Sequence, residues 1–524
     1  MGTYLNPGNE NFREMVNADI FVDKSMLLHE TNNMLDTSDK YVCMARPRRF
    51  GKTYAGNMIA AYYSRGCDSR QIFDGLKIAS DADYERRLNK YNVIYIDLNS
   101  EFQNADNKMN MLKELKREIK AEIVEQYPNA GVLRNHSLGK SVQHVYEKTG
   151  DTFIIIIDEY DVMVREQVSR ALFDEFLGML NGLFKSNTLR PAISLAYLTG
   201  ILPIVRDKIQ SKLNNFDEYT VLNPGRFSEY AGFTADEVKS LCETYGVDYE
   251  ECRCWYDGYQ LNGYEIYNPE SVVKCVRNKY FDSYWGKTST YQVISDRLEQ
   301  NFRGTKEGVI RMLAGESVDV NVTSYLNTMD SFASRNDVFT YLIHLGYLAY
   351  DRQTSTCRIP NREIRQEWHN AIEVNDDYAE TNRIIESSRE LLERTIHGDE
   401  EAVARALDVS HIHVTSNRSH NNEDAFQSAI YLAYIYALND YTAIREMTAG
   451  KGFADMVYVP VKKDKPALII ELKHNKTAES AMDQIKNKQY FDSLSHYKGN
   501  LIFVGINYDE RSRSHECRIE RFEV

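Results

Sequence analysis

The sequence predicts an α/β protein of several domains, and three observations support this fold class. The chain has 524 residues, which is long for one hydrophobic core and typical of three or four domains. Over residues 1–220, short apolar runs alternate with helical patterns. From residue 423 onward, the patterns follow the order helix, three strands, helix, strand. The first alternation predicts a parallel sheet covered by helices, and the second predicts a separate αβββαβ domain.

The first 220 residues are expected to form a βαβ domain. Their apolar runs are short and are bounded by turns or charged residues, which is typical of buried parallel strands. The stretches between them have the spacing of helices. The expected strands are Tyr41–Met44, Val93–Leu98, Phe153–Ile157 and Ile193–Leu198, and the expected helices are Tyr54–Tyr63, Lys108–Gln126 and Ser169–Phe184.

The turn between the first strand and its helix has the pattern of a phosphate-binding P-loop. In such a turn, backbone N–H groups and the helix N-terminus face a phosphate. Lys52 is expected to neutralise the phosphate charge, and Thr53 to bind Mg²⁺. The usual pattern has glycine where Arg46 stands, so a basic turn before an ordinary helix remains the alternative. The expected nucleotide-binding residues of the turn are Arg46, Pro47, Arg48, Arg49, Phe50, Gly51, Lys52, Thr53 and Tyr54.

Two acidic residues follow the four isoleucines of the third expected strand. Ligands of open α/β sheets bind beyond the carboxyl ends of the strands. Asp158 is therefore expected to hold Mg²⁺, and Glu159 to orient or deprotonate an attacking water. Thr199 ends the fourth strand, where it can sense a γ-phosphate or simply cap a turn. Together with the Gly-Lys-Thr turn, the acidic pair predicts a site for ATP and Mg²⁺.

Residues 221–385 change to helical patterns separated by aromatic turns. Helices are expected at Ala235–Tyr245, Asn268–Lys279 and Thr290–Glu299. We interpret this region as a helical lid that includes winged-helix-like modules. The sequence therefore predicts three domains: 1–220, 221–385 and 386–524.

The last domain carries a second group of reactive residues. Asp455 precedes one expected strand, whereas Glu471 and Lys473 end the next and share one face of it. A hairpin can bring the two carboxylates together to bind Mg²⁺ or Mn²⁺. Lys473 can then position a water or stabilise charge on a phosphate. Glu423 is a candidate further ligand from the preceding helix. The expected elements are a helix at Glu423–Leu438, strands near Tyr441–Met447, Ala454–Pro460 and Ala467–Leu472, a helix at Thr477–Leu494 and a strand at Leu501–Ile506.

Composition narrows the classes of partner and compartment. The net charge of −14 argues against a protein that simply coats nucleic acid. Any contact with DNA or RNA must come from a local basic surface or from phosphates bridged by metal. No stretch approaches the roughly 18 apolar residues of a membrane span. The start of the chain lacks a basic region followed by an apolar core, and the eight cysteines are scattered. We therefore expect a cytoplasmic protein with no membrane partner.

Taken together, the motifs resemble the bacterial AAA-ATPase-like proteins that carry a C-terminal PD-(D/E)XK nuclease-like domain. That family also has arginine at the first glycine position of the P-loop. The resemblance implies an AAA-like P-loop NTPase core, a lid, and a restriction-endonuclease-like domain with Asp455, Glu471 and Lys473 as its triad. The pattern around Gln484 and Tyr490 belongs to the same family. The other motifs that carry it are Phe21–Lys24, Leu213–Asn215, Trp255–Tyr259, Tyr267–Pro269, Gly346–Leu348 and Ile359–Asn361.

The sequence favours an ATP-dependent, metal-dependent hydrolase that acts on DNA or RNA. The alternative is a nucleotide-dependent switch whose nuclease-like domain only binds a partner. Phe453 favours the alternative, because the family usually has arginine two residues before the aspartate. An adaptor with decayed motifs is disfavoured by the number of reactive residues that remain. The sequence leaves open whether the protein forms a homo-oligomer.

Overall fold

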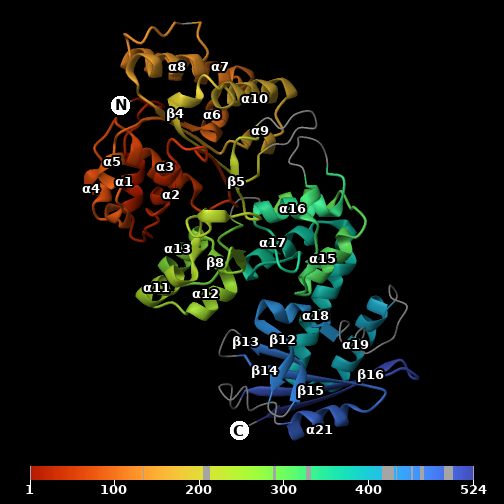
Figure 1. Cartoon of the computed structure of the whole chain (residues 1–524). Helices are drawn as coiled ribbons and strands as arrows, with labels where there is room; N and C mark the ends of the chain where they lie inside the picture. Colours follow the sequence, from red (N-terminus) through yellow and green to blue (C-terminus); the bar gives the residue numbers. More distant parts are fainter. Residues whose placement is uncertain are drawn as a thin grey trace. The chain divides into compact units, whose positions relative to one another are not determined.

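A computed structural model shows two compact units, drawn in Figure 1. The first unit comprises Met1–Lys287 and Asp319–Ile364, and the second comprises Thr288–Val318 and Arg365–Val524. The three-domain division expected from the sequence stays a prediction, since these units are defined by packing alone. The structure describes residues 2–133, 135–204, 213–286, 291–325, 332–415, 430–431, 433–449, 452–460, 465–488 and 500–522.

A parallel five-stranded sheet with the order β2-β3-β4-β1-β5 organises the first unit. This α/β arrangement is the P-loop, AAA-like fold class that the sequence predicts. Because β4 lies between β1 and β3, the ends of these three strands meet at one edge of the sheet. The strands are β1 (Tyr41–Ala45), β2 (Asn92–Asp97), β3 (Phe153–Asp158), β4 (Ile193–Gly200) and β5 (Asp217–Tyr219).

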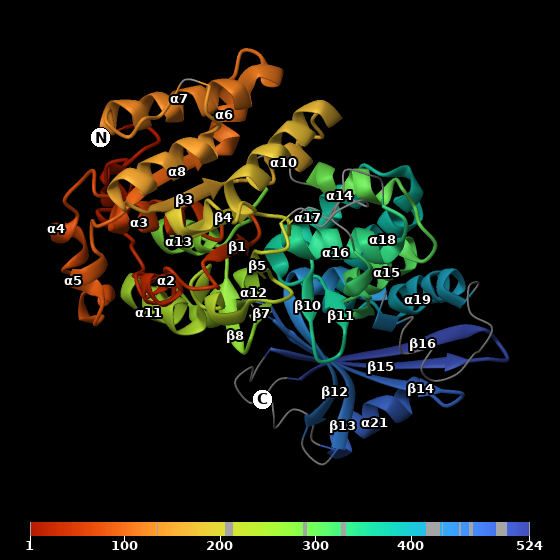
Figure 2. The ribbon, with the colours of Figure 1, turned by 45° about the horizontal axis from the view of Figure 1, so that its top comes forward.

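The isoleucines of β3 show how the sheet buries both faces. Ile155 and Ile157 pack in a core with helices α7, α8 and α10. Ile154 and Ile156 point to the opposite face and pack with α1, α2 and α3. Figure 2 shows α7, α8 and α10 together on one side of the strands. These helices are α1 (Glu10–Val16), α2 (Leu27–Met34), α3 (Lys52–Tyr63), α7 (Met111–Gln126), α8 (Leu138–Thr149) and α10 (Arg170–Phe184).

Short helices complete this α/β layer. Each joins a strand to a longer helix or runs along the rim of the sheet. They are α4 (Arg70–Phe73), α5 (Tyr84–Arg87), α6 (Leu98–Asn104) and α9 (Val162–Arg165), with 3-10 helices at Lys77–Ser80, Lys108–Asn110, Arg190–Ala192 and Gly225–Phe227.

A small helical module follows the sheet in the same unit. Its core packs residues from α11, α12 and α13, including three buried cysteines. Thr234 and Glu237 form a reciprocal capping box that starts α11. The elements are α11 (Ala235–Tyr245), α12 (Tyr249–Tyr256), α13 (Pro269–Asn278) and the antiparallel strands β6 (Phe233–Thr234), β7 (Tyr259–Leu261) and β8 (Tyr264–Tyr267).

The rest of the first unit is a helix followed by a hairpin. Strands β10 and β11 pair antiparallel directly after α16. Helix α17 starts in this unit and continues across the boundary at Ile364. The elements are a 3-10 helix at Val322–Ser324, α16 (Arg335–Leu345), β10 (Ala349–Asp351), β11 (Thr356–Arg358) and α17 (Arg362–Glu373), with the two-residue strand β9 (Val318–Asp319) at the other boundary.

The second unit is built on a mixed five-stranded sheet in sequential order β12-β13-β14-β15-β16. Only β14 and β15 pair parallel, because α21 crosses between them. Met482 and Ile485 of α21 pack on the sheet core. The elements are α14 (Tyr291–Leu298), α15 (Thr305–Leu313), α18 (Ala379–His397), α19 (Glu400–Thr415), α21 (Ala478–Lys488), β12 (Tyr441–Ala449), β13 (Gly452–Pro460), β14 (Ala467–His474), β15 (Leu501–Asp509) and β16 (Ser514–Phe522), with 3-10 helices at Asp376–Tyr378 and Ile435–Asn439.

Most expected elements are confirmed to within two or three residues. The four N-terminal strands become β1 to β4, and the four strands expected after residue 440 become β12 to β15. The sequence reasoning missed α8, β5 and the last strand, β16. It was wrong to place all of Trp255–Tyr259 in a turn, because α12 extends to Tyr256 and leaves only Asp257 and Gly258 between it and β7. Most of the helix expected at 423–438 lies outside the described residues.

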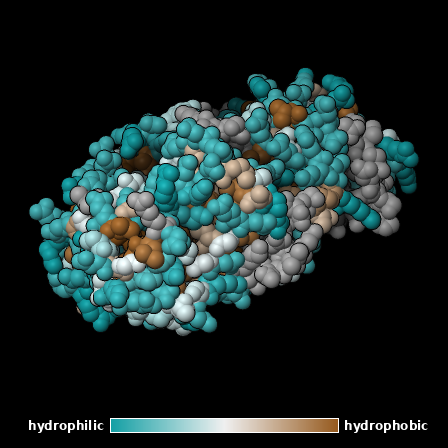
Figure 3. Space-filling view, turned by 90° about the horizontal axis from the view of Figure 1, so that it is seen from above, coloured by the Kyte–Doolittle hydropathy of each residue, from teal (hydrophilic) through white to brown (hydrophobic). Residues whose placement is uncertain are grey.

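Hydrophobic residues do not gather into a membrane-spanning element. Among the described residues, no helix is long and apolar enough to cross a membrane. Hydrophilic residues predominate on the face seen in Figure 3, and hydrophobic ones lie there in small separate patches. All eight cysteines are free thiols.

Candidate nucleotide site and nuclease-like site

The P-loop turns sharply between β1 and α3. Gly51 caps the N-terminus of α3 with a φ of 81°, and Arg49 has a φ of 70°. A φ of this sign strains any residue with a Cβ atom, so Gly51 is the residue that suits this position. Left-handed residues at alternate positions before a helix direct successive backbone N–H groups into one hollow. The local sequence therefore builds an anion-binding turn even without a glycine at residue 46.

Lys52 lies folded across this turn. Its side chain is buried, and Nζ donates to the carbonyl oxygen of Pro47 over 2.9 Å. Burial lowers the pKa of Lys52, whereas the carboxylates of Glu159, Asp161 and Asp158 raise it. The ammonium group therefore sits among three carboxylates, close to the place where a phosphate on the loop would add further negative charge.

The ends of β3 and β4 bring Asp158, Thr199 and Thr53 together. Asp158 is only 1% exposed, and the hydroxyl of Thr199 donates to its Oδ1 atom. Burial raises the pKa of Asp158, whereas the hydroxyl groups of Thr199 and Thr53 oppose that rise. A hydroxyl and a carboxylate beside the P-loop lysine form a donor set that suits a hard divalent cation. The structure thus brings these sequence-predicted residues to one point.

Glu159 is held by a residue that the sequence reasoning missed. It has a φ of 53°, and its backbone N–H donates to Asp158 Oδ1 over 3.1 Å. Its carboxylate forms an ion pair with Arg165 of α9. Arg165 Nε also lies 3.4 Å from Asp161 Oδ2. The Arg165 side chain is 10% exposed and lines the same cavity as Lys52. In this arrangement the candidate base is neutralised by a neighbouring guanidinium.

Asp161 has a structural position rather than a place in the phosphate hollow. Its fully buried carboxylate accepts hydrogen bonds from the backbone N–H groups of Ile201 and Leu202 over 3.0 and 2.9 Å. It therefore fixes the loop that follows β4, and with it the orientation of Thr199.

A cavity of about 820 Å³ extends from the P-loop. Its polar lining includes Lys52, Thr53, Glu159 and Arg165, together with half-exposed Tyr54. Helix α13 contributes Lys274 and Arg277 to the wall, and apolar side chains also line the cavity. A cavity lined by phosphate-binding groups and by apolar side chains suits a nucleotide. The apolar lining that sequence reasoning did not assign is Ile20, Phe21, Val22, Tyr230, Phe233 and Val273.

Arg46 differs from the other residues of the loop. Its guanidinium is fully buried and donates to the carbonyl oxygens of Ala45, Tyr219 and Phe227 over 3.0, 2.7 and 3.3 Å. Arg46 does not line the cavity. This burial corrects the expectation of a phosphate contact. It favours a structural role in which Arg46 ties the P-loop to β5 and the segment after it.

The other loop residues anchor the turn to the helical module. Arg49 Nε lies 3.2 Å from Glu270 Oε2 on α13, and Arg49 also donates to the carbonyl of Tyr284. Phe50 is buried edge-on against Tyr259 with ring centroids 5.3 Å apart. Arg48 lines the cavity beside them. The P-loop therefore contacts the module that we interpret as a lid.

The second unit brings Asp455 and Glu471 side by side. Strands β13 and β14 pair antiparallel with Met456 opposite Ile470, and continuing this register puts Asp455 opposite Glu471. Residues directly opposite on antiparallel strands have side chains on the same face. Asp455 Oδ2 accepts a hydrogen bond from the backbone N–H of Leu472 over 2.7 Å. The hairpin expected from the sequence is thus present at these two residues.

Glu471 is a buried carboxyl group with one unsatisfied oxygen. It is 1% exposed, and among the described residues Oε2 has no hydrogen-bond partner. Oε1 accepts from Lys473 Nζ over 2.9 Å. Burial, and then the charge of Asp455, raise the pKa of Glu471 to about 7. An orphaned carboxylate oxygen beside a second carboxylate suits a divalent cation.

The structure describes only part of the ligand set that the sequence predicts for the second unit. Within the described residues, no group of three His, Cys, Asp or Glu side chains is placed to hold a metal. Glu423 and Tyr490 lie outside those residues. Gln484 lies half-buried on α21. Of the expected ligands, Asp455 and Glu471 lie within the described residues, with Lys473 beside them.

Comparisons with known proteins find a family match for each of two regions of the chain. Residues 7–210 match the family model described as a predicted AAA-ATPase. Residues 421–517 match the model of the PD-(D/E)XK nuclease superfamily. The first match includes the P-loop and the acidic end of β3, and the second includes Asp455, Glu471 and Lys473. The chain thus carries an AAA-ATPase-like domain and a PD-(D/E)XK superfamily domain.

One protein sequence and one solved structure are also similar to this chain. An uncharacterized protein in the vnfD 5′ region of Azotobacter chroococcum is 21% identical over 501 residues, which is 90% of each chain. The structure of the Aeropyrum pernix ORC2 protein, in ADPNP-ADP complexes, covers 68% of this chain and 97% of its own. Its identity is 12% and its TM-score is 0.30.

Proposed function

From the union of an AAA-ATPase-like domain and a PD-(D/E)XK nuclease superfamily domain, we propose an ATP-binding enzyme that acts on nucleic acid. The first unit binds ATP with Mg²⁺ and hydrolyses it. The second unit cuts phosphodiester bonds with Mg²⁺ or Mn²⁺. The observation that carries the proposal is the meeting of Thr53, Asp158 and Thr199 beside buried Lys52.

Each residue of the nucleotide site has a separate task in this proposal. The N–H groups of the Gly51 turn and Lys52 bind the phosphates. Thr53 and Asp158 hold Mg²⁺, which neutralises the charge of the phosphates when it is bound. Glu159 orients the attacking water once its carboxylate leaves Arg165. Thr199 keeps Asp158 in place through its hydroxyl group.

The ATPase part is tested with three variants of the full chain. Lys52→Ala should weaken ATP binding at least tenfold, whereas Glu159→Gln should keep binding and lose turnover. Lys148→Ala is the matched control, because Lys148 is an exposed lysine on α8. Equal ATP affinity and equal turnover in all three variants would reject the assignment of this cavity.

In the proposed nuclease reaction, three residues hold the cation, the attacking water and the phosphate. Asp455 and Glu471 hold the cation, which supplies Lewis acidity to the phosphodiester when it is bound. Lys473 donates hydrogen bonds to the attacking water or to a phosphate oxygen. Its Nζ already lies at the carboxylate of Glu471, so it is held at the site before substrate arrives.

Purified protein should cleave DNA or RNA only with Mg²⁺ or Mn²⁺. Lys473→Ala should reduce cleavage by about two orders of magnitude or more, the usual cost of removing a group that stabilises transition-state charge. Lys476→Ala is the matched control, since this exposed lysine follows β14 directly. Equal cleavage rates for the wild-type and Lys473→Ala proteins would reject the nuclease assignment.

A second candidate function is favoured by the Glu159–Arg165 ion pair. With the candidate base held by arginine, the protein can bind ATP and turn it over slowly. ATP then acts as a switch, and the nuclease-like domain binds nucleic acid without cutting it. Slow turnover with a nucleotide-dependent change in oligomeric state would support this function, and fast turnover with metal-dependent cleavage would reject it.

A further inference from the structure

A second cavity of about 400 Å³ lies at the N-terminal end of strand β1, whereas the P-loop follows the C-terminal end of that strand. Tyr41, the first residue of β1, lines it, whereas the P-loop follows the last residue of β1. Because a strand rises about 3.3 Å per residue, the two sites are roughly 16 Å apart along this five-residue strand. Asn214 and Asn215 also line the cavity. They belong to the Leu213–Asn215 motif, to which the proposed ATPase and nuclease sites give no role.

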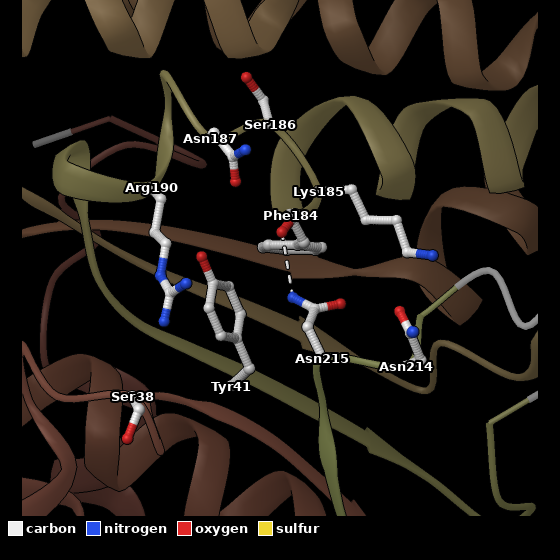
Figure 4. Close-up of a pocket in the computed structure, with 9 residues that line it drawn as sticks. All are labelled: Ser38, Tyr41, Phe184, Lys185, Ser186, Asn187, Arg190, Asn214 and Asn215. Carbon is white, nitrogen blue, oxygen red and sulfur yellow. Dashed lines mark hydrogen bonds between the residues drawn. The ribbon is translucent and has the colours of Figure 1, made fainter.

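Among the described residues that line this cavity, the charged ones are Lys185 and Arg190, and none is a carboxylate, although the chain has 77 acidic residues against 63 basic ones. In Figure 4 the guanidinium of Arg190 lies beside the ring of Tyr41. Its charge lowers the pKa of the Tyr41 phenol, which burial raises more strongly. Among the described residues, Arg190 takes part in no ion pair. The cavity therefore favours an anion.

One buried amide shows that an inorganic anion alone is not the best fit. Asn215 Nδ2 donates to the carbonyl of Phe184 over 3.0 Å, which fixes the orientation of the amide group. In the described part of the chain, Asn215 Oδ1 is buried without a hydrogen-bond partner. A buried acceptor without a donor costs about 1–3 kcal/mol. A ligand that fits must therefore supply a hydrogen-bond donor as well as negative charge.

The wall beneath these polar groups is formed by packed aromatic rings. Tyr41 lies edge-on to Phe184 and Phe216, with centroids 6.3 and 5.4 Å apart, and the two phenylalanines are 5.2 Å apart. Tyr41 and Phe184 are almost fully buried. A site walled by such rings needs little reorganisation to accept a planar group. A volume near 400 Å³ lies in the range of small-ligand sites.

We propose that this cavity binds a nucleoside phosphate, with the phosphate at Arg190 and Lys185 and a donor of the base or sugar at Asn215 Oδ1. The ligand is either a free mononucleotide or the terminal nucleotide of a nucleic-acid strand, which share this chemistry. The site goes beyond the proposed ATPase and nuclease functions, because it uses none of their residues.

The test measures binding to the full-length Lys52→Ala protein, in which the P-loop site is weakened. The probes are the four nucleoside monophosphates, a short single-stranded oligonucleotide with and without a 5′-phosphate, and inorganic phosphate. Arg190→Glu reverses the charge at an exposed position and should fold normally. Asn215→Leu removes both the amide donor to Phe184 and the acceptor Oδ1, whereas Asn215→Asp keeps the acceptor and removes the donor. Arg117→Ala is the matched control on the surface of α7.

The Lys52→Ala protein should bind a nucleoside monophosphate or, of the two oligonucleotides, only the one with a 5′-phosphate. The affinity for that probe should fall at least tenfold when Arg190→Glu is added. It should also fall with Asn215→Leu and stay unchanged with Arg117→Ala. Which probe binds identifies the source of the nucleotide. Three results would overturn the proposal: no binding of any probe at millimolar concentration, equal competition by inorganic phosphate, or no loss of affinity in Arg190→Glu. Failure of ATP hydrolysis or of nuclease activity leaves these outcomes unchanged.

Discussion

The nucleotide site and the nuclease-like site both pair two carboxyl groups, but they neutralise them differently. Asp158 accepts hydrogen bonds from the Thr199 hydroxyl and from the backbone N–H of Glu159, and Glu159 is ion-paired with Arg165. Glu471 has one lysine as partner and one orphaned oxygen, with Asp455 beside it. Protein groups therefore pair the acids of the first site, whereas the second keeps one buried carboxylate oxygen without a partner among the described residues. The difference shows that a pair of acids in a sequence does not tell how its charge is balanced.

The largest expected effect separates the two sites by their response to metal. Without nucleotide, Mg²⁺ or Mn²⁺ should stabilise the second unit by about 3 kcal/mol at a hundred times its Kd, because it binds the folded site. The first unit should respond much less, since its acids already have partners. Urea unfolding of the wild type with and without metal measures this stabilisation, with a separate spectroscopic probe in each unit.

Glu471→Gln and Glu510→Gln serve as the test and control variants for this effect. The first should abolish the stabilisation by metal. The second variant changes an exposed acid directly after β15, and it should keep the stabilisation by metal. Equal metal stabilisation of both variants would show that the orphaned oxygen is not a metal ligand.

The next largest effect concerns Glu363, a buried acid that has hydrogen-bond partners. Glu363 Oε1 accepts from Ser271 Oγ and from the backbone N–H groups of Tyr284 and Trp285 over 2.9, 2.8 and 2.8 Å. Burial raises its pKa from 4.5 to about 7. Because the folded protein favours the protonated form, its contribution to stability is full below pH 4.5 and is lost as the pH rises through 7.

Glu363→Gln keeps the acceptor oxygen and removes the charge. The variant should therefore exceed the wild type in unfolding free energy by on the order of 2 kcal/mol at pH 8.5, and match it near pH 4.5. Urea unfolding of the first unit at both pH values measures this difference. A variant that is less stable than the wild type at pH 8.5 would contradict the burial of a charge at this position.

The smallest expected effect concerns the arginine of the nucleotide site. Arg165→Ala should free Glu159 and raise basal ATP turnover by about tenfold, which is about 1.4 kcal/mol of activation free energy. Arg165→Lys should have a smaller effect, because lysine keeps the charge but loses the second contact to Asp161. Steady-state kinetics with separate kcat and KM values decide the matter. A rise in KM with unchanged kcat would instead make Arg165 a phosphate-binding residue.

Local patterns predicted much of the two sites. Four isoleucines in a row indicated a strand buried on both faces, and the acids after it had to emerge at the edge of the sheet. Glu471 and Lys473, two residues apart in a strand, had to share a face. Arg165 could not be found in this way, because its partners Glu159 and Asp161 sit in a non-helical turn whose path is set by packing.

The sequence by itself determined the strand, turn and helix order, the positions of the reactive residues and the two fold classes, since these depend on periodicity and spacing. Only the tertiary structure decided that Arg46 is buried beneath carbonyl groups of β5, that Thr199 lies between the P-loop strand and the acidic strand, and that Asn214 and Asn215 line a cavity with Arg190. The physical reason is that strand order and burial join residues more than a hundred positions apart, and no local pattern records which of them will meet.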